Sequence, residues 1–495
     1  EIGMRLRGTQ QNPSVLPAES LYAIEHDTMD TTFRSMYQGL YIYLSARKER
    51  RDLLLSQRPP RFDESLDSMI SRSEDDFTRI ALKAKAAQDY FLLIGPPGTG
   101  KTSCALKKMV ETFHADKDAQ ILLLSYTNRA VDEICKSLAS IAPAVDFIRV
   151  GSELSCDEAY RGHLIENELS SCNRRSEVYE RIRNCRIIVG TVAAISGKPE
   201  LFRLKHFDVA IIDEATQILE PQLLGILCAR GEDGKDAIDK FVLIGDHKQL
   251  PAVVQQNTEQ SAIYDESLLS IGLTNLKDSL FERLYRNCTA TVHRSYDMLC
   301  RQGRMHPEVA LFANRAFYGG RLIPVGLPHQ IESSDTICRL AFYPSVPEKA
   351  GASAKINYSE ARIVADLAAR IYEEHQTDFD ESRTLGIITP YRSQIALIKK
   401  EIESLGIPAL NRILVDTVER FQGSERDVII YSFCVNYPYQ LKFLSNLTEE
   451  EGVLIDRKLN VALTRARKQM FITGVPELLE RNPLYKSLLK LIESF

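Results

Sequence analysis

Apolar positions along the chain follow two different patterns. Near residues 20–57 they recur every three to four positions, as in Phe33, Met36, Leu40 and Leu44, which predicts a helix that packs by one face. From about residue 78, short runs of Ile, Leu and Val alternate with helical stretches. The first five runs are YFLLI (90–94), AQILLLS (119–125), RIIVG (186–190), DVAIID (208–213) and KFVLIG (240–245). Nearly continuous apolar strands separated by helices predict a parallel sheet covered on both faces.

A second series of such runs follows after about residue 295. Its strands are expected at TLGIITP (384–390), ILVDTV (413–418), RDVIIYSF (426–433) and QMFITG (469–474). The chain is therefore predicted to be an α/β protein with two α/β units in tandem. We place a helical and linker region at 1–70, the first unit at 71–290 with a charged helical insert at about 152–183, and the second unit at 291–495.

Composition narrows the class of protein only modestly. The 495 residues are 44% hydrophobic and 26% charged, with a net charge of -5, which is ordinary for a globular protein and argues against a uniformly basic surface. Ten cysteines form no C-x-x-C pair, so we expect free thiols and a cytoplasmic, intracellular location. The longest apolar runs are too short to span a bilayer, so no membrane association is expected. Because the chain begins with Glu, we expect that it starts inside a longer protein.

A glycine-rich loop follows the first of the predicted strands. The sequence GPPGTGKT matches G-x-x-x-x-G-K-[ST] and lies between a strand and a helix pattern, which disfavours a chance Gly-Pro turn. Backbone N–H groups and a helix N-terminus favour phosphate there, Lys101 is placed to reach the β- and γ-phosphates, and the Thr102 hydroxyl is placed to ligate Mg²⁺. The loop predicts that ATP is bound by Gly95, Pro96, Pro97, Gly98, Thr99, Gly100, Lys101, Thr102 and Ser103.

Two polar segments at the ends of later strands complete the predicted phosphate site. Asp213 and Glu214 of DEATQ follow a buried strand, so Asp213 is predicted to hold Mg²⁺ with Thr102 and Glu214 to polarise the attacking water. The alternative is an acidic helix start. Gln249 of GDHKQLPAVV is the candidate sensor of the γ-phosphate, since an amide can bond either the phosphate or the water.

A P-loop alone does not distinguish a GTPase, an unfoldase and a helicase, but the second unit does. RKLNVALTRARKQMFITG (457–474) leads from a helix into a strand and places two arginines on one side. Arginine suits the charge that develops on a γ-phosphate during its transfer.

Several motifs occur in a fixed order: GPPGTGKT, SYTNRAVDEI, DEATQ, GDHKQLPAVV, SLFERL, RQGRMHP, GIITPYRSQ, VDTVERFQGSERDVIIYS and LNVALTRAR. Over about residues 75–480 the chain resembles the superfamily 1 helicases, specifically the 1B group that includes the nonsense-mediated-decay RNA helicase and the replication helicase-nuclease. The resemblance implies two RecA-like domains with ATP and Mg²⁺ between them, preceded by a helical stalk. It also implies 5′ to 3′ movement along single-stranded nucleic acid, either DNA or RNA.

The resemblance assigns roles to individual residues. Gln249, Arg304 and Arg465 are expected to contact the γ-phosphate, and Gly423 and Glu425 to lie near the nucleotide's sugar and phosphates. Contacts to the nucleic-acid strand are expected from Thr127, Asn128, Thr191, Thr389, Tyr391 and Thr417. For each threonine, a structural cap at the end of a strand is an equally good interpretation.

Two departures from the family pattern concern the adenine base. Relatives carry a glutamine about seventeen residues before the P-loop, where this chain has EDDFTRIAL with Thr78 near the expected place. Many relatives also have a tyrosine where this chain has Gly303. We therefore predict weaker discrimination of ATP from other nucleoside triphosphates than these two contacts would give. Two other functions stay open: a nucleic-acid-stimulated ATPase switch, and a P-loop motor that remodels proteins.

Overall fold

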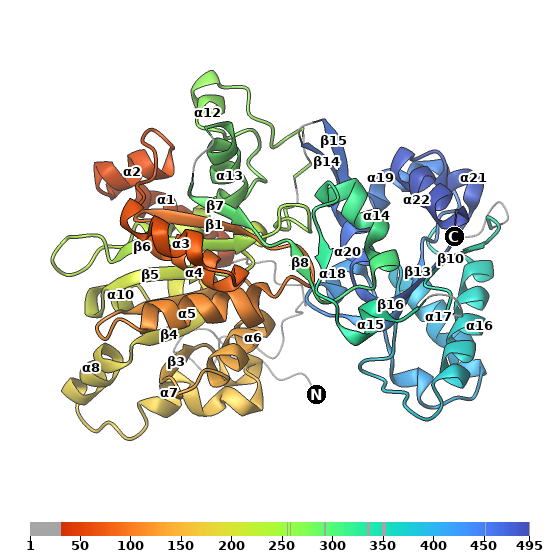
Figure 1. Ribbon diagram of the computed structural model, residues 1–495, viewed down its shortest axis with the longest axis horizontal. Helices are drawn as coiled ribbons and strands as arrows, with labels where there is room; N and C mark the ends of the chain where they lie inside the picture. Colours follow the sequence, from red (N-terminus) through yellow and green to blue (C-terminus); the bar gives the residue numbers. More distant parts are fainter. Residues whose placement is uncertain are drawn as a thin grey trace, which may run out of the picture.

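A computed structural model describes residues 31–494, apart from 255, 258, 292–293, 334–336, 349–352 and 451. The first half of the predicted N-terminal region, residues 1–30, lies outside the described residues. The chain forms two α/β lobes, each built around its own parallel sheet (Figure 1).

The first lobe contains a seven-stranded parallel sheet in the order β3-β4-β2-β5-β6-β1-β7. Its strands are β1 (Tyr90–Ile94), β2 (Ile121–Ser125), β3 (Phe147–Val150), β4 (Ile187–Thr191), β5 (Phe207–Ile212), β6 (Ile238–Gly245) and β7 (Tyr296–Met298). The five predicted strands are all present. β3 and β7 were not predicted, because each has three or four residues, one of them charged. β7 pairs with β1 and lies beyond the boundary placed at residue 290, so the first sheet extends to residue 298.

Helices cover both faces of this sheet. Leu92 and Ile94 of β1 point into one apolar layer, while Phe91 and Leu93 point into the other, so alternate side chains of one strand are buried on opposite faces. The covering helices are α4 (Asp76–Ala86), the π-helical turn η2 (Lys101–Leu106), α5 (Lys107–His114), α6 (Asn128–Ala139), α9 (Val192–Ser196), α10 (Glu200–Leu204), α11 (Glu220–Leu227) and α13 (Leu280–Ala290). The short helix α12 (Glu266–Ser270) has no buried residue and lies away from the sheet (Figure 1). The insert predicted at 152–183 is helical, with α7 (Ile165–Glu168) and α8 (Arg175–Asn184).

The second lobe contains a five-stranded parallel sheet in the order β10-β16-β13-β11-β12. The strands are β10 (Leu340–Pro344), β11 (Leu385–Ile388), β12 (Leu414–Asp416), β13 (Arg426–Ser432) and β16 (Ala466–Gly474). Its helices include α14 (Pro307–Tyr318), α15 (Pro328–Ile331), α16 (Tyr358–Glu374), α17 (Arg392–Ser404), α18 (Val418–Phe421), α20 (Arg457–Leu463), α21 (Pro476–Leu479) and α22 (Pro483–Glu493). The predicted fold class, α/β with two tandem RecA-like units, is confirmed.

The region predicted as an N-terminal helix is broken into α1 (Thr31–Ser45) and α2 (Lys48–Leu54). The packing face predicted for it was wrong, because Phe33 and Leu44 of α1 are 58% and 67% exposed. Instead, α1 lies on α11 through Gly39, where a Cβ atom would collide with the Pro221 carbonyl oxygen. Backbone contact at a glycine therefore decides which face packs, and apolar spacing does not reveal it.

Candidate nucleotide and nucleic-acid sites

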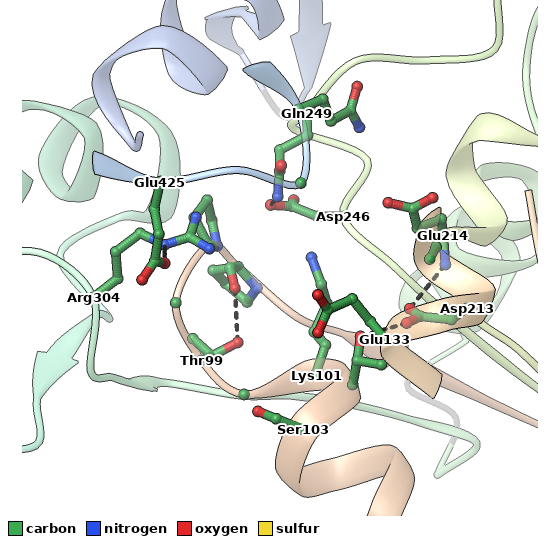
Figure 2. A pocket seen from close by; sticks show the side chains of 18 of the residues that line it. Thr99, Lys101, Ser103, Glu133, Asp213, Glu214, Asp246, Gln249, Arg304 and Glu425 are labelled. Atoms are coloured by element: carbon green, nitrogen blue, oxygen red, sulfur yellow. Dashed lines mark hydrogen bonds and ion pairs between the residues drawn. The ribbon is translucent and has the colours of Figure 1, made fainter. Parts of the chain in front are cut away.

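A cleft of about 880 Å³ lies between the two lobes. The first lobe contributes the P-loop and the segments that follow β5 and β6. The second lobe contributes residues 301–304, 419–426 and 465–467. The volume is in the range of about 300–1,000 Å³ that is usual for small-ligand sites. The predicted phosphate residues of both units therefore line one composite cleft (Figure 2).

The P-loop is shaped by backbone conformations that favour glycine. Gly98 and Gly100 have φ of 74° and 75°, in the left-handed region. A Cβ atom on Gly98 would also collide with Arg304, and the N–H of Gly303 donates to the Gly98 carbonyl at 2.8 Å. The second lobe thus touches the phosphate loop directly at this glycine.

Lys101 lies in the middle of the cleft (Figure 2). Burial lowers the pKa of its ammonium group, while the carboxylates of Asp246, Asp213 and Glu214 oppose that shift. A cation that is partly stripped of water and surrounded by acids is suited to a highly charged anion such as a triphosphate. Lys101 thus lies where a phosphate of a bound nucleotide is expected, and its contact with the β- and γ-phosphates stays a prediction.

The acidic pair after β5 lies beside the P-loop. Thr102 Oγ1 donates to Asp213 Oδ2 at 2.5 Å, and the N–H of Glu214 donates to Asp213 Oδ1 at 2.8 Å. Hydroxyl and carboxylate oxygens are the ligands that Mg²⁺ prefers, so Thr102 and Asp213 fit this ion.

Glu214 has the properties of a general base. Its φ is 54°, an uncommon left-handed conformation for a non-glycine residue, and such outliers cluster at active sites. Its Oε2 is buried and has no hydrogen-bond partner among the described residues. Burial, helped by the charge of Asp213, raises the pKa of Glu214 to about 7. A carboxylate with this pKa accepts a proton near neutral pH.

Gln249 lies between the two lobes. Its Nε2 donates to Asp246 Oδ2 at 2.7 Å, and its Oε1 is 3.5 Å from Arg465 Nη2. Arg465 is 2% exposed, and its guanidinium also donates to the carbonyl oxygens of Val461 and Ser424, at 3.0 and 3.3 Å. Burial, followed by the charge of Arg304, lowers the pKa of Arg465 to about 9. Arg465 of the second lobe, held by two carbonyl oxygens of its own lobe, thus faces Gln249 of the first lobe.

Arg304 and Glu425 line the cleft but are paired with each other. Arg304 Nε is 2.5 Å from Glu425 Oε2, and Arg467 Nε is 3.7 Å from Glu425 Oε1. In this conformation Glu425 accepts from Nε of Arg304 and the Thr464 carbonyl accepts from Nη1 at 3.3 Å, so the ion pair orients the guanidinium at the wall of the cleft. Gly423 lines the same wall of the cleft.

The residues expected to contact a nucleic-acid strand fall into different environments. Thr127 Oγ1 accepts the N–H of Ala130 at 3.2 Å and so caps α6, next to Asn128, and Thr127 also lines the nucleotide cleft. Thr191 Oγ1 caps α9 by accepting the N–H of Ala194 at 3.1 Å. Both threonines are structural caps, as the alternative interpretation had it.

Three further strand candidates lie in the second lobe. Thr417 is the N-cap residue of α18, and Tyr391 is half-buried, with its hydroxyl accepting from Gln440 Nε2 at 3.1 Å. Thr389 is fully buried, and its hydroxyl has no hydrogen-bond partner among the described residues. The contact predicted for Thr389 is therefore not possible in this conformation, because the side chain points into the core.

Sequence reasoning missed two residues that connect the lobes. The Tyr318 hydroxyl, fully buried, donates to Asp246 Oδ2 at 2.7 Å and accepts from Asn460 Nδ2 at 2.8 Å. Asn460 lies in the LNVALTRAR motif, and this position in a motif could have identified it as a candidate site residue. Tyr318 lies in an apolar helix, and no feature of the sequence distinguishes it from a core residue.

Apolar side chains line the cleft beside both positions that depart from the family pattern. The Thr78 hydroxyl already donates a hydrogen bond to Asp75 of its own segment, at 2.6 Å. Phe77 lines the cleft beside Gly100, and Gly303 and Val325 also line it. A Cβ atom on Gly303 would be 3.2 Å from Leu327, so this corner is too crowded for a larger side chain without rearrangement.

We expect weak preference for ATP over GTP, CTP and UTP. Apolar contact with Phe77 and Val325 does not distinguish one base from another, and a missing aromatic stack costs about 1 kcal/mol. The values of kcat/KM for the four nucleotides should lie within about tenfold of one another. A preference for ATP of more than about a hundredfold would contradict this reading.

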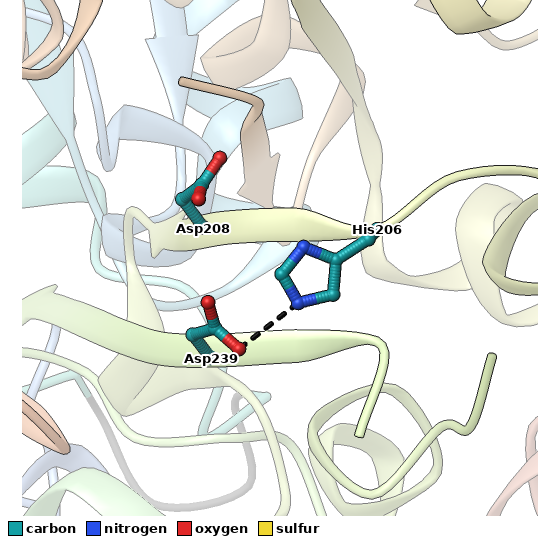
Figure 3. A group of neighbouring side chains, drawn as sticks. All are labelled: His206, Asp208 and Asp239. Atoms are coloured by element: carbon teal, nitrogen blue, oxygen red, sulfur yellow. Dashed lines mark hydrogen bonds and ion pairs between the residues drawn. The ribbon is translucent and has the colours of Figure 1, made fainter. Parts of the chain in front are cut away.

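A group of potential metal ligands lies away from the cleft. His206, Asp208 and Asp239 lie at the amino ends of β5 and β6, with His206 Nε2 2.9 Å from Asp239 Oδ1 (Figure 3). The nucleotide cleft is at the opposite, carboxyl ends of these strands. Solvated acidic groups form such arrangements without an ion, and we assign no metal to this group. None of the described helices has the length and apolar character needed to cross a membrane.

Comparisons with known proteins agree with this geometry. Two family models described as AAA domain match, one over residues 72–178 and 165–257 and the other over residues 276–477. The DNA replication ATP-dependent helicase/nuclease DNA2 of Bos taurus is 27% identical over 98% of this chain and 46% of its own length. The helicase/nuclease JHS1 of Arabidopsis thaliana is 29% identical, over 96% of this chain and 35% of its own length.

A shorter relative matches over more of its own length. The DNA polymerase alpha-associated DNA helicase A of Saccharomyces cerevisiae is 24% identical over 92% of this chain and 73% of its own length. By contrast, the chain spans about half the length, or less, of the helicase/nucleases. The matches extend over both lobes, and the resemblance seen in the ordered motifs is confirmed. Over both lobes the chain is similar to the superfamily 1B ATP-dependent helicases.

Proposed function

We propose that this chain is a motor core that hydrolyses ATP with Mg²⁺ and moves 5′ to 3′ along a single nucleic-acid strand. The observation that carries the proposal is the composite cleft, in which Gln249 of the first lobe meets Arg465 of the second. A γ-phosphate held between them bonds both lobes, so its release changes how the lobes are held together.

The hydrolysis step is assigned to residues around Lys101. Lys101 holds the β- and γ-phosphates, and Thr102 with Asp213 holds Mg²⁺, which when bound neutralises charge on those phosphates. Glu214 takes the proton of the attacking water, and Gln249 orients that water. Arg465 stabilises the charge that spreads over the γ-phosphate oxygens during transfer. Arg304, oriented by Glu425, adds a second positive charge to the same side of the cleft.

Coupling to movement is assigned to the contacts around residues 246–249. Besides Tyr318 and Asn460, Glu450 of the second lobe accepts from His247 Nε2 at 3.0 Å. A buried ion pair between Arg457 and Glu282 also joins the lobes. Side chains from the second lobe thus contact residues 246–249, the segment proposed to sense the γ-phosphate. Through these contacts the loss of the γ-phosphate is transmitted to the second lobe.

We favour DNA over RNA as the strand, because the relatives reported above are named as DNA helicases. The protein-remodelling motor is disfavoured by the second RecA-like unit with its LTRAR segment. An ATPase switch uses the same residues, so only a measurement of unwinding separates it from a helicase.

The proposal is tested by ATPase assays with matched single-stranded DNA and RNA. We expect turnover to rise when single-stranded DNA is added and to rise less with RNA of the same sequence. Equal turnover with DNA, with RNA and with neither would count against a nucleic-acid motor of any kind.

A further inference from the structure

An exposed aromatic group follows β13 in the second lobe. Residues 437–443, here called the aromatic segment, form the short helix η7 (Pro438–Gln440) and the start of α19 (Leu441–Leu444). Tyr439 and Phe443 are 55% and 69% exposed. The ring of Tyr439 lies parallel to that of Tyr437, with centroids 5.8 Å apart, and edge-on to that of Phe443, at 6.5 Å.

Buried polar side chains hold the backbone of the aromatic segment in place. Gln440 is 2% exposed, and its Oε1 accepts from the backbone N–H groups of Asn436 and Tyr437, both at 2.9 Å. Asn436 is also buried, and its Nδ2 donates to the carbonyl of Ile356 at 2.7 Å. Three neighbouring rings, two of them mostly in solvent, form an apolar patch on this buried polar scaffold, and such grouped patches often mark binding surfaces.

The turn into the aromatic segment is strained. Cys434 has a φ of 49°, and its N–H donates to the buried carboxyl group of Glu360 at 2.8 Å. Burial raises the pKa of Glu360 to about 7. A non-glycine residue kept in this conformation by a buried partner is the kind of strain found at functional sites.

The aromatic segment adjoins a residue already assigned to the nucleic-acid strand. Gln440 Nε2 donates to the hydroxyl of Tyr391 at 3.1 Å, so the scaffold of the rings and the strand candidate are directly bonded. Lys442, exposed on α19, adds a positive charge beside the rings. Figure 1 shows α19 on the same side of the second lobe as the hairpin of β14 (Leu447–Glu450) and β15 (Val453–Asp456), which reaches the first lobe.

We propose that Tyr437, Tyr439 and Phe443 form a stacking platform for unpaired bases of the bound strand. The inference rests on the proposed function, since it concerns the same strand. Every base has a π-face, so stacking on such rings tolerates any sequence, as a motor that moves along DNA requires. Lys442 is placed to contact phosphates of the stacked nucleotides.

The test compares a fluorescent oligothymidylate with the same sugar-phosphate chain lacking bases, by anisotropy. The wild type should bind the base-containing strand more tightly. The double substitution Tyr439→Ala and Phe443→Ala should weaken that binding by about tenfold or more and leave binding of the abasic strand unchanged. Retaining the rings by Tyr439→Phe should preserve affinity. Tyr37→Ala, which removes an equally exposed ring on α1, is the matched control.

The outcomes separate this inference from the proposed function. If the double substitution weakens binding of both strands by the same factor, or weakens binding of neither, the stacking platform is wrong while the proposed motor function stands. Unchanged binding of both strands would favour a protein as the ligand of this surface. A wild type that binds neither strand contradicts the proposed function itself. Turnover without nucleic acid should be the same in the double variant and the wild type, because the aromatic segment does not line the nucleotide cleft.

Discussion

Replacing Glu214 with Gln will lower kcat for ATP hydrolysis by about 10²- to 10⁴-fold, the usual contribution of a general base. Nucleotide affinity should change little, because Gln keeps the shape of the side chain while Lys101, Thr102 and Asp213 are untouched. Steady-state ATPase kinetics and binding of a fluorescent ATP analogue measure the two effects. Glu133→Gln, which alters another carboxylate that lines the cleft, is the matched control and should retain most activity.

The same residue sets an expected pH dependence. Burial raises the pKa of Glu214 to about 7, and the base is active only when ionised, so kcat/KM should fall as the pH drops through 7. The dependence of kcat/KM reports groups of the free enzyme, which is the state described here. The acidic limb should disappear in Glu214→Gln. A variant that keeps the limb, or keeps full turnover, would assign the base to another residue.

Replacing Arg465 with Lys will lower kcat by about 10³-fold, which is the lower bound for losing an arginine that stabilises the transferring phosphate. Lysine keeps the charge but not the planar fork that bonds the carbonyl oxygens of Val461 and Ser424 while facing Gln249. The KM for ATP should change much less, since the contact strengthens in the transition state.

Its control is the neighbouring arginine. Arg467 Nη1 is 3.2 Å from Asp427 Oδ1, so Arg467→Lys should have a far smaller effect on kcat. Thermal unfolding of each variant shows whether loss of the buried fork has destabilised the lobe. An equal loss of kcat in both variants would mean that Arg465 holds the structure and does not act on the phosphate.

The sequence predicted the parts of the fold that leave a strong local pattern. Long apolar strands such as Phe207–Ile212 were found, because burial on both faces requires an unbroken run. The antiparallel hairpin β14–β15 and the short edge strand β7 were missed, since LTEE and YDM resemble loops. The packing of α1 was misread because Gly39 makes the contact and contributes no apolar side chain.

In the candidate site, too, the sequence predicted some features and missed others. Lys101, Thr102 and Asp213 are close in space because parallel strands bring their carboxyl ends to one edge, and motif spacing reveals that arrangement. The pairing of Arg304 with Glu425 joins residues 121 positions apart in the chain and depends on how distant segments of the second lobe pack together. The burial of Thr389 likewise depends on the direction in which a strand-end side chain points, which a motif does not specify.

We infer that the cleft between the lobes converts ATP hydrolysis into directed movement on a single strand. Strand displacement on duplexes carrying either a 5′ or a 3′ single-stranded DNA tail tests it most directly, with Glu214→Gln as the hydrolysis-deficient control. We expect ATP-dependent unwinding from the 5′ tail only, and none by the variant. Unwinding from the 3′ tail, or DNA-stimulated hydrolysis that displaces neither strand, would contradict it.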